Sequence, residues 1–170
     1  HGQAARALRT GRILRTAMTL SVALVEPEIP PNTGNVARLC AANRVPLHIV
    51  GKPSFHLDDR AVRRAGLDYW PHVALHRHSN LDALGVAWPE ARLLFFSAHA
   101  PRSHFDWCYG ENDCLVFGPE STGLPAGLLD AHADRCLAIP MLNPEVRSLN
   151  LATAVGIVLY EALRQLRAFG

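Results

Sequence analysis

The first residues whose types and spacing could do chemistry lie in the stretch "IPPNTGNVARLCAANRV" near the amino end. Asn32 and Asn35 favour turns and helix caps, and Gly34 lets the backbone turn tightly or approach a ligand. We expect a helix from about Thr33, with Arg38 near its start, where free backbone amides attract anions. Taken alone, this stretch is explained slightly better by an ordinary helix cap with a surface arginine.

A second stretch of this kind is "LVFGPESTGLP", residues 115–125. A buried strand is expected to end at Phe117 and to lead into a loop with two glycines, two prolines and one acid, Glu120. Ligands bind at the carboxyl ends of strands in parallel α/β sheets, although a tight loop before a helix also needs glycine and proline. The loop lacks the GK[ST] of a Walker motif and the GxGxxG of a dinucleotide site.

The third stretch is "IPMLNPEVRSLNLATA", residues 139–154. Another strand ends in a proline-rich loop, and this loop enters the last helix through Arg147, Ser148 and Asn150. A serine oxygen can accept a hydrogen bond from a free amide of the first turn, so we expect Ser148 to cap that helix. Three polar loops at strand ends predict one composite pocket.

The elements that must position these loops follow from the alternation of apolar runs with helical patterns. Strand-like runs stand at residues 20–26, 47–50, 72–75, 92–97, 114–118 and 136–140. The last helix carries an apolar stripe at spacings of three and four, formed by Leu151, Val155, Val158, Leu159, Ala162 and Leu166. This pattern is typical of an α/β fold with a mostly parallel sheet and helices on both faces.

Composition narrows the class of protein. The chain has 170 residues, of which 49% are hydrophobic and 19% charged, as in a single globular domain. A net charge of +2 gives only weak support for a polyanionic partner. The longest apolar run is interrupted by Glu161, Arg164 and Gln165, which favours a buried helix and no membrane span. Four cysteines without CxxC spacing predict reduced, buried thiols in a cytoplasmic protein.

The first 17 residues differ from the rest of the chain. Arginine recurs at positions 6, 9, 12 and 15, no acid is present, and Met18 precedes the first strand-like run. We expect residues 1–17 to be a basic leader, encoded by a vector or translated from upstream, and residues 18–170 to be one domain. A genuine basic extension or a transit-like segment is the alternative.

Taken together, the three stretches resemble the signature motifs of a known family. "PNTGNVAR", "FGPESTGLP" and "IPMLNPEVRSLNLATA" resemble, in order, those of the SPOUT methyltransferases that act on ribose 2'-hydroxyls of RNA. "EPEIPPNTGNVARLC" and "RRAGLDYW" are similar to the small enzymes that methylate cytidine or modified uridine at the tRNA wobble position, 34. The resemblance covers about residues 20 to 167. It implies a carboxyl-terminal trefoil knot, a homodimer and the tRNA anticodon stem-loop as partner.

The resemblance also implies roles for particular residues. Arg38 matches the arginine assigned to activation of the hydroxyl. It would either accept the proton in an unusual setting or stabilise the developing alkoxide and hold the adjacent phosphate. Glu120, Ser148 and Asn150 match positions around the same centre and would orient Arg38 or the ribose, while Asn35 would shape the loop.

The cofactor implied by the resemblance is S-adenosyl-L-methionine, with S-adenosyl-L-homocysteine as product. The residues expected to bind it are Phe96, Gly118, Ile139 and Ser148, with Met141 and Leu149 as walls of the pocket. Backbone groups at such positions can read adenine while apolar side chains enclose it.

Other polar clusters carry weaker interpretations. Arg60, Arg63 and Arg64 are as compatible with RNA phosphates as with a charged helix face. The histidines of "HVALHRH" lack an obvious completing ligand, so we expect no metal. The three tryptophans favour core or interface positions over base stacking. Methylation of another RNA such as rRNA, and a non-catalytic RNA-binding scaffold, stay open, whereas an oxidoreductase would need the missing glycine fingerprint.

Overall fold

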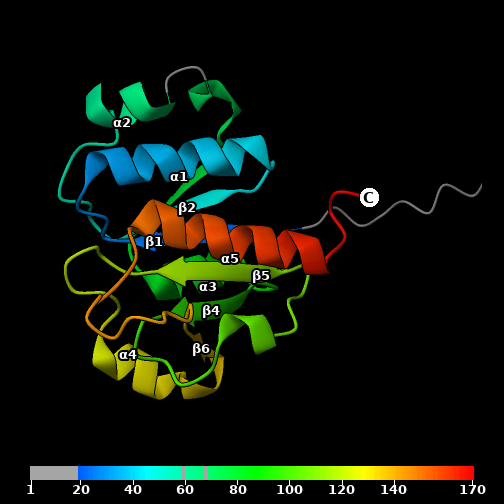
Figure 1. Ribbon diagram of the computed structural model, residues 1–170. Helices are drawn as coiled ribbons and strands as arrows, with labels where there is room; N and C mark the ends of the chain where they lie inside the picture. The colour runs from blue at the N-terminus through cyan, green and yellow to red at the C-terminus, as the bar shows by residue number, and fades with distance from the viewer. Residues whose placement is uncertain (1–18, 59, 67–68) are drawn as a thin grey trace, which may run out of the picture.

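A six-stranded sheet forms the centre of the computed structural model, which describes residues 19–58, 60–66 and 69–170 (Figure 1). The leader expected at residues 1–17 and the start at Met18 lie outside the described residues. The strands, in the order in which they lie across the sheet, are β3 (Leu75–His78), β2 (Leu47–Val50), β1 (Ser21–Val25), β5 (Asp113–Phe117), β4 (Arg92–Phe96) and β6 (Cys136–Leu137). Every pairing between them is parallel, which confirms the expected fold class.

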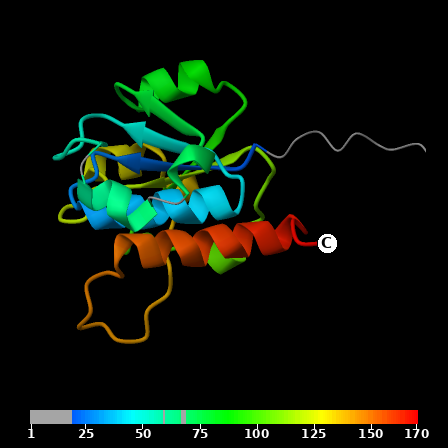
Figure 2. The ribbon, with the colours of Figure 1, turned by 90° about the horizontal axis from the view of Figure 1, so that it is seen from above.

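Helices cover both faces of this sheet (Figure 2). One face carries α1 (Pro30–Ala42) and α5 (Leu151–Gln165), and α2 (Arg60–Gly66) packs beside α1. The other face carries α3 (Leu81–Ala87) and α4 (Ala126–Ala131). Single 3₁₀ turns lie at η1 (Trp70–His72), η2 (His104–Asp106) and η3 (Ala133–Arg135).

Two apolar layers separate the sheet from its helices. Alternate side chains of a strand point to opposite faces, so Val22 and Leu24 join the layer under α1 and α5 while Ala23 joins the layer on the opposite face. The apolar stripe of α5 is buried at five of its six predicted positions and half-buried at Leu166. The helical periodicity therefore identified the face of α5 that packs on the sheet.

The strand expected at residues 72–75 is shifted. Residues 70–72 form the turn η1, and β3 begins only at Leu75. Pro71 lies at the start of this turn, where its fixed φ and its missing N–H are tolerated. The prediction was wrong because it overlooked Pro71, which stands directly before the apolar run and starts the turn.

Helix α1 also begins earlier than expected. It starts at Pro30 without a side-chain cap, so the asparagines and Gly34 lie inside the helix and form no turn before it. Proline suits the first helical positions, which have no intrahelical N–H partner in any case. A Cβ on Gly34 would lie 2.5 Å from Ala65 Cβ and 2.6 Å from the Val62 carbonyl oxygen. Gly34 thus permits close packing of α1 on α2 and does not form the tight turn that its residue type would allow.

Helix α5 is capped by a different residue from the one expected. The N-cap is Asn150, whose Oδ1 accepts a hydrogen bond from the Thr153 amide at 3.2 Å. Ser148 lies two residues before this cap and lines a pocket instead. The long loop after β6 therefore delivers Asn150 to the helix start.

The loops after β4 and β6 lie against each other. The Ala138 amide donates to the Arg102 carbonyl at 2.8 Å, and the His104 amide donates to the Ala138 carbonyl at 2.9 Å. The trefoil knot implied by the resemblance would involve the segment that follows, and it stays a prediction.

Two further expectations concern the cysteines and the membrane. Cys40, Cys114 and Cys136 are buried, Cys108 is exposed, and all four are free thiols. The prediction of burial was thus wrong for Cys108. Among the described residues, none of the helices has the length and apolarity that a membrane crossing needs.

Candidate active site

The loops that follow β1 and β5 are joined by two acidic side chains. The carboxylate of Glu120 accepts hydrogen bonds from the backbone amides of Glu28, at 2.7 Å, and Ile29, at 3.3 Å. In return, Ser121 donates from its hydroxyl at 2.7 Å and its amide at 3.1 Å to the Glu28 carboxylate. These bonds, first from the hydroxyl and then from the amide, lower the pKa of Glu28. Glu120 therefore fixes the entry to α1 and has backbone amides, not Arg38, as its hydrogen-bond partners.

The loop after β6 joins the same place through two asparagines. Asn150 Nδ2 donates to Asn32 Oδ1 at 3.0 Å, and Asn32 is buried on α1. The cap of α5 and the first turn of α1 are thus linked directly. The structure brings the three predicted motif loops together at the carboxyl ends of the parallel strands.

Arg38 lies on the exposed face of α1, one turn after Asn35, which is also exposed. Its guanidinium carbon is 4.7 Å from the centroid of the Tyr69 ring, and its Nη2 donates to Tyr69 Oη at 3.4 Å. Within the described part of the chain, the ion pairs leave Arg38 without a carboxylate partner. Its positive charge is therefore available to an anion from solution.

Sequence reasoning did not select Tyr69 as a site residue. The tyrosine stands in "RRAGLDYW", which was quoted for its resemblance, but no polar cluster or turn pattern marks it. Its contact with Arg38 joins residues 31 positions apart, and only the packing of α2 and η1 beside α1 brings them together.

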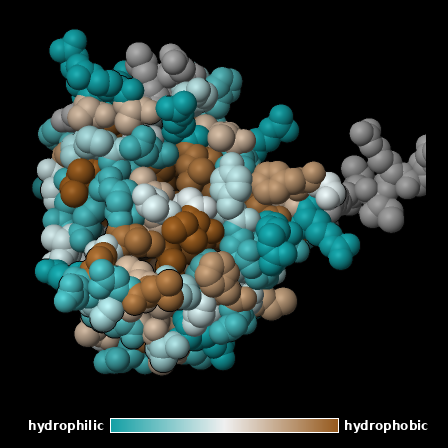
Figure 3. Space-filling model, viewed as in Figure 1, coloured by the Kyte–Doolittle hydropathy of each residue, from teal (hydrophilic) through white to brown (hydrophobic). Residues whose placement is uncertain are grey.

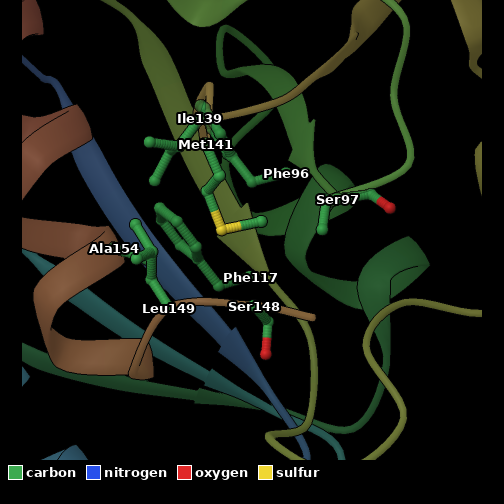
Figure 4. A pocket seen from close by; sticks show the side chains of 9 residues that line it. Phe96, Ser97, Phe117, Ile139, Met141, Ser148, Leu149 and Ala154 are labelled. Atoms are coloured by element: carbon green, nitrogen blue, oxygen red, sulfur yellow. The ribbon is translucent and has the colours of Figure 1, made fainter. Parts of the chain in front are cut away.

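An apolar pocket lies beside these loops (Figure 4). Five of the residues expected to bind the cofactor line it: Phe96, Ile139, Met141, Ser148 and Leu149. Sequence reasoning missed its other lining residues, which are Ser97, Ala98, Phe117 and Ala154. Ser97 and Ala98 directly follow Phe96 in the sequence, whereas Phe117 is the partner of Phe96 on the neighbouring strand and Ala154 lies on α5. Only the register of the sheet and the packing of α5 bring the last two into the pocket.

Gly118 has a different place from the one expected. It is not part of the pocket lining, and a Cβ there would lie 2.4 Å from the backbone of Gly123 and Leu124. Gly123 itself has φ +66°, a conformation that favours glycine. Gly118 thus allows the loop after β5 to fold back on itself next to the pocket.

The pocket is suited to a flat, largely apolar group. The rings of Phe96 and Phe117 stack with centroids 4.8 Å apart, and the Met141 side chain reaches over the pocket, while the hydroxyls of Ser97 and Ser148 point away from its apolar centre (Figure 4). Its volume is about 100 Å³, which is below the few hundred Å³ of pockets that enclose a cofactor. A nucleoside-sized group would therefore have to displace Met141 or stay partly in solvent.

The remaining predicted residues lie on α2. Arg60, Arg63 and Arg64 are all exposed, and Arg63 lines a second, basic hollow at the β3 edge of the sheet. His76 and His78 do not stand alone, because they lie beside His48, whose Nδ1 is 2.9 Å from His78 Nε2. Over the residues that the structure describes, no three histidine, cysteine or acidic side chains are arranged to hold a metal ion.

Comparisons with known proteins agree with this geometry. The SpoU rRNA Methylase family matches residues 19–160. The tRNA (cytidine(34)-2'-O)-methyltransferase of Escherichia coli strain K12 is 47% identical over 148 residues, which cover 86% of this chain and 94% of that protein. A putative tRNA (cytidine(34)-2'-O)-methyltransferase of Synechocystis is 46% identical over 153 residues, or 89% of this chain and 99% of that protein.

Solved structures with the same fold were also found. One described as giving structural insights into the 2-OH methylation of C/U34 on tRNA has a TM-score of 0.83 and 49% identity, covering 88% of this chain and 97% of that chain. An AdoMet-bound rRNA methyltransferase from Sinorhizobium meliloti has a TM-score of 0.75 and 26% identity, covering 86% of this chain and 56% of that chain. On the family match and these identities, the chain belongs to the SpoU rRNA methylase family.

Proposed function

We propose that this chain transfers a methyl group from S-adenosyl-L-methionine to the ribose 2'-hydroxyl of the tRNA wobble nucleotide, cytidine or modified uridine 34. The observation that carries the proposal is the junction of the three motif loops. On one side of it lies the Arg38 guanidinium, which has no carboxylate partner among the described residues, and on the other side lies the apolar pocket. Relatives more than 40% identical over most of the chain are named as methyltransferases of tRNA cytidine 34, which supports this substrate.

The apolar pocket would hold the cofactor. Phe96, Ile139 and Leu149 supply apolar walls for an adenine ring, and Met141 would pack over it. When bound, the cofactor supplies a methyl group already activated on a sulfonium sulfur, so the protein needs no covalent intermediate. Transfer of that methyl group to the ribose oxygen would release the hydroxyl proton to solvent and leave S-adenosyl-L-homocysteine.

Arg38 would act on the ribose oxygen. A guanidinium keeps its proton in nearly all settings, which favours stabilisation of the developing alkoxide and of the adjacent phosphate over literal proton abstraction. The exposed position of Arg38 over Tyr69, without a carboxylate partner among the described residues, supports this electrostatic role. Asn35, one turn earlier on the same face, would contact the same nucleotide.

The other predicted catalytic residues would hold α1 or the cofactor in place and would not take part in the reaction themselves. Glu120 holds the amides ahead of α1, and Asn150 bonds Asn32 on the first turn of that helix. Both contacts fix the helix that carries Arg38. Ser148 would contact the cofactor from the loop before α5, where it lines the pocket.

Exposed apolar side chains support a homodimer. Leu142 is fully exposed in the loop after β6, and Val146, Tyr160 and Phe169 are exposed in that loop, on α5 and after it. Figure 3 shows apolar surface gathered around α5 on this face of the molecule. Such a patch is typical of a protein interface, and a dimer would set two sites beside one anticodon stem-loop. We place the protein in the cytoplasm, where this substrate is found.

Transfer of labelled methyl from S-adenosyl-L-methionine to purified tRNA and rRNA pools tests the proposal. We expect label in tRNA, and nuclease mapping with mass spectrometry should locate a single 2'-O-methyl group on nucleotide 34. Label confined to rRNA would reassign the substrate, and rRNA is the second candidate because the family is named for rRNA methylation. Absence of label in both pools would favour a non-catalytic RNA-binding scaffold.

A further inference from the structure

A second hollow, of about 690 Å³, opens at the β3 edge of the sheet. The segment after β2, helix α2, turn η1 and strand β3 surround it. Three exposed cations line it, namely Lys52, Arg63 and Arg77, together with one carboxylate, Asp58. Among the described residues, the charged side chains that line the hollow therefore leave an excess of two positive charges.

The floor of this basic hollow is aromatic. Phe55 and Trp70 line it, and both are half-buried against the core under α1. Because both side chains pack against the core, their positions beside the hollow are constrained before a ligand binds. A single RNA strand exposes phosphates and base faces. Cations can bind the phosphates, and aromatic rings can stack on the bases.

The segment that carries Lys52 and Phe55 is anchored to the active-site loops. Gly51 has φ +75°, and its amide donates to the His78 carbonyl at 2.9 Å. The Ser54 amide donates to the Pro27 carbonyl at 3.1 Å, just before the amides that Glu120 holds. The basic hollow is thus positioned by the same loop that positions α1.

One dipeptide connects the hollow to Arg38. Tyr69 contacts the Arg38 guanidinium, while the next residue, Trp70, lines the hollow. Consecutive Cα atoms are about 3.8 Å apart, so the two sites lie on two sides of one short segment. An RNA strand with its ribose at Arg38 would have neighbouring nucleotides within reach of the hollow.

We propose that the basic hollow binds a backbone phosphate of the RNA strand next to the methylated nucleotide, with a flanking base against Trp70 or Phe55. The inference rests on the proposed function and assigns it a substrate-positioning site. Phosphate contacts of this kind set register without reading sequence. Lys52 and Arg77 are positioning residues, since neither is among the residues that contact Arg38 or line the cofactor pocket.

The test compares two variants with the wild-type chain. Lys52→Gln/Arg77→Gln removes two cations of the hollow, and Arg44→Gln removes one exposed cation just ahead of the amino end of β2. The probe is a synthetic anticodon-arm hairpin with cytidine at the wobble position, and Kd is measured by fluorescence anisotropy across salt concentrations. We expect the double variant to bind about tenfold more weakly, with a salt slope smaller by about 1 to 2, and Arg44→Gln to match wild type.

Asp58→Asn should change hairpin affinity in the opposite direction, because it removes a negative charge from the hollow. Removal of Asp58, the one carboxylate among the described residues that line the hollow, should tighten hairpin binding by about twofold to threefold, which a misfolded variant would not do. Calorimetry should give the same S-adenosyl-L-methionine affinity for all variants.

A double variant that binds like Arg44→Gln, or an Asp58→Asn variant that binds no tighter than wild type, overturns the inference and leaves the proposed function intact. A wild-type chain that binds the hairpin through the hollow but methylates no tRNA overturns the proposed function instead.

Discussion

The guanidinium of Arg38 lies over the ring of Tyr69, 4.7 Å from its centroid, and donates to its hydroxyl at 3.4 Å. This contact holds the arginine on the exposed face of α1 without neutralising its charge. Tyr69 thus belongs to the site through its geometry, although its residue type is common on any surface.

Two substitutions of Tyr69 should separate the contribution of its ring to kcat from that of its hydroxyl. An exposed cation–π contact is worth about 0.5–1 kcal/mol, so Tyr69→Ala should lower kcat about twofold to fivefold as Arg38 loses its position. Tyr69→Phe keeps the ring and should stay within twofold of wild type. Steady-state methyl transfer measures both, and equal kcat values for all three proteins would show that the contact does not position Arg38.

Arg38 itself should be needed for transfer and not for cofactor binding. Arg38→Ala should lower kcat by at least about a hundredfold, the size typical of losing one preorganised group at a developing oxyanion. Calorimetry should give an unchanged Kd for S-adenosyl-L-methionine. Arg38→Lys, which retains the charge, should recover part of the rate if the role is electrostatic. Retained transfer in Arg38→Ala would remove this residue from the mechanism.

Glu120 should stabilise the fold as well as the site. Glu120→Ala leaves the amides of Glu28 and Ile29 without their carboxylate partner, and we expect a loss of about 1–2 kcal/mol in the free energy of unfolding. Ser121→Ala is the matched control, because it removes an exposed hydroxyl bond to Glu28 and should cost below about 0.5 kcal/mol. Urea denaturation of both variants is the measurement, and equal midpoints would contradict the structural role of Glu120.

Gly34 should tolerate no side chain. Gly34→Ala places a Cβ 2.5 Å from Ala65 Cβ, and we expect overpacking to cost about 1–3 kcal/mol of stability. Gly85 lies within α3 with nothing within 4 Å of an added Cβ, so Gly85→Ala should instead stabilise the protein by about 0.5–1 kcal/mol. Denaturant unfolding of the pair should therefore give shifts of opposite sign. Two stabilising substitutions would mean that α2 does not press on α1 at Gly34.

His48 should make stability dependent on pH. Burial, and then the nearby charges of His78 and His76, lower the pKa of His48 to about 3, whereas an unfolded histidine titrates near 6.5. Below pH 6.5 the unfolded chain therefore binds a proton that the folded chain does not. The contribution of neutral His48 to the free energy of unfolding is complete above pH 6.5 and is lost as pH falls toward 3. The loss can reach about 1 kcal/mol per pH unit.

Urea midpoints between pH 7 and 4 should fall more steeply for wild type than for His48→Gln. His99→Gln, at an exposed position, should follow the wild-type curve. Identical slopes for wild type and His48→Gln would mean that His48 takes up its proton without unfolding.

Much of the fold could be read from local patterns. The alternation of apolar runs and helical stretches predicted a parallel sheet with helices on both faces, because strands buried on both faces leave such runs in the sequence. The stripe of α5 predicted its buried face. Each predicted site motif follows a strand or begins a helix, and parallel strands end at one edge, so the junction of the three motif loops was also predictable.

Contacts between distant residues were decided only by the tertiary structure. Glu120 holds amides 92 and 91 positions earlier, Asn150 bonds a residue 118 positions away, and Arg38 meets Tyr69 across 31 positions. The sequence by itself determined which elements form and which motif residues they carry, since side-chain period and backbone preference are local properties. The partner of each side chain, and the basic hollow beside Trp70, depend on how loops and helices pack, and no local pattern encodes that packing.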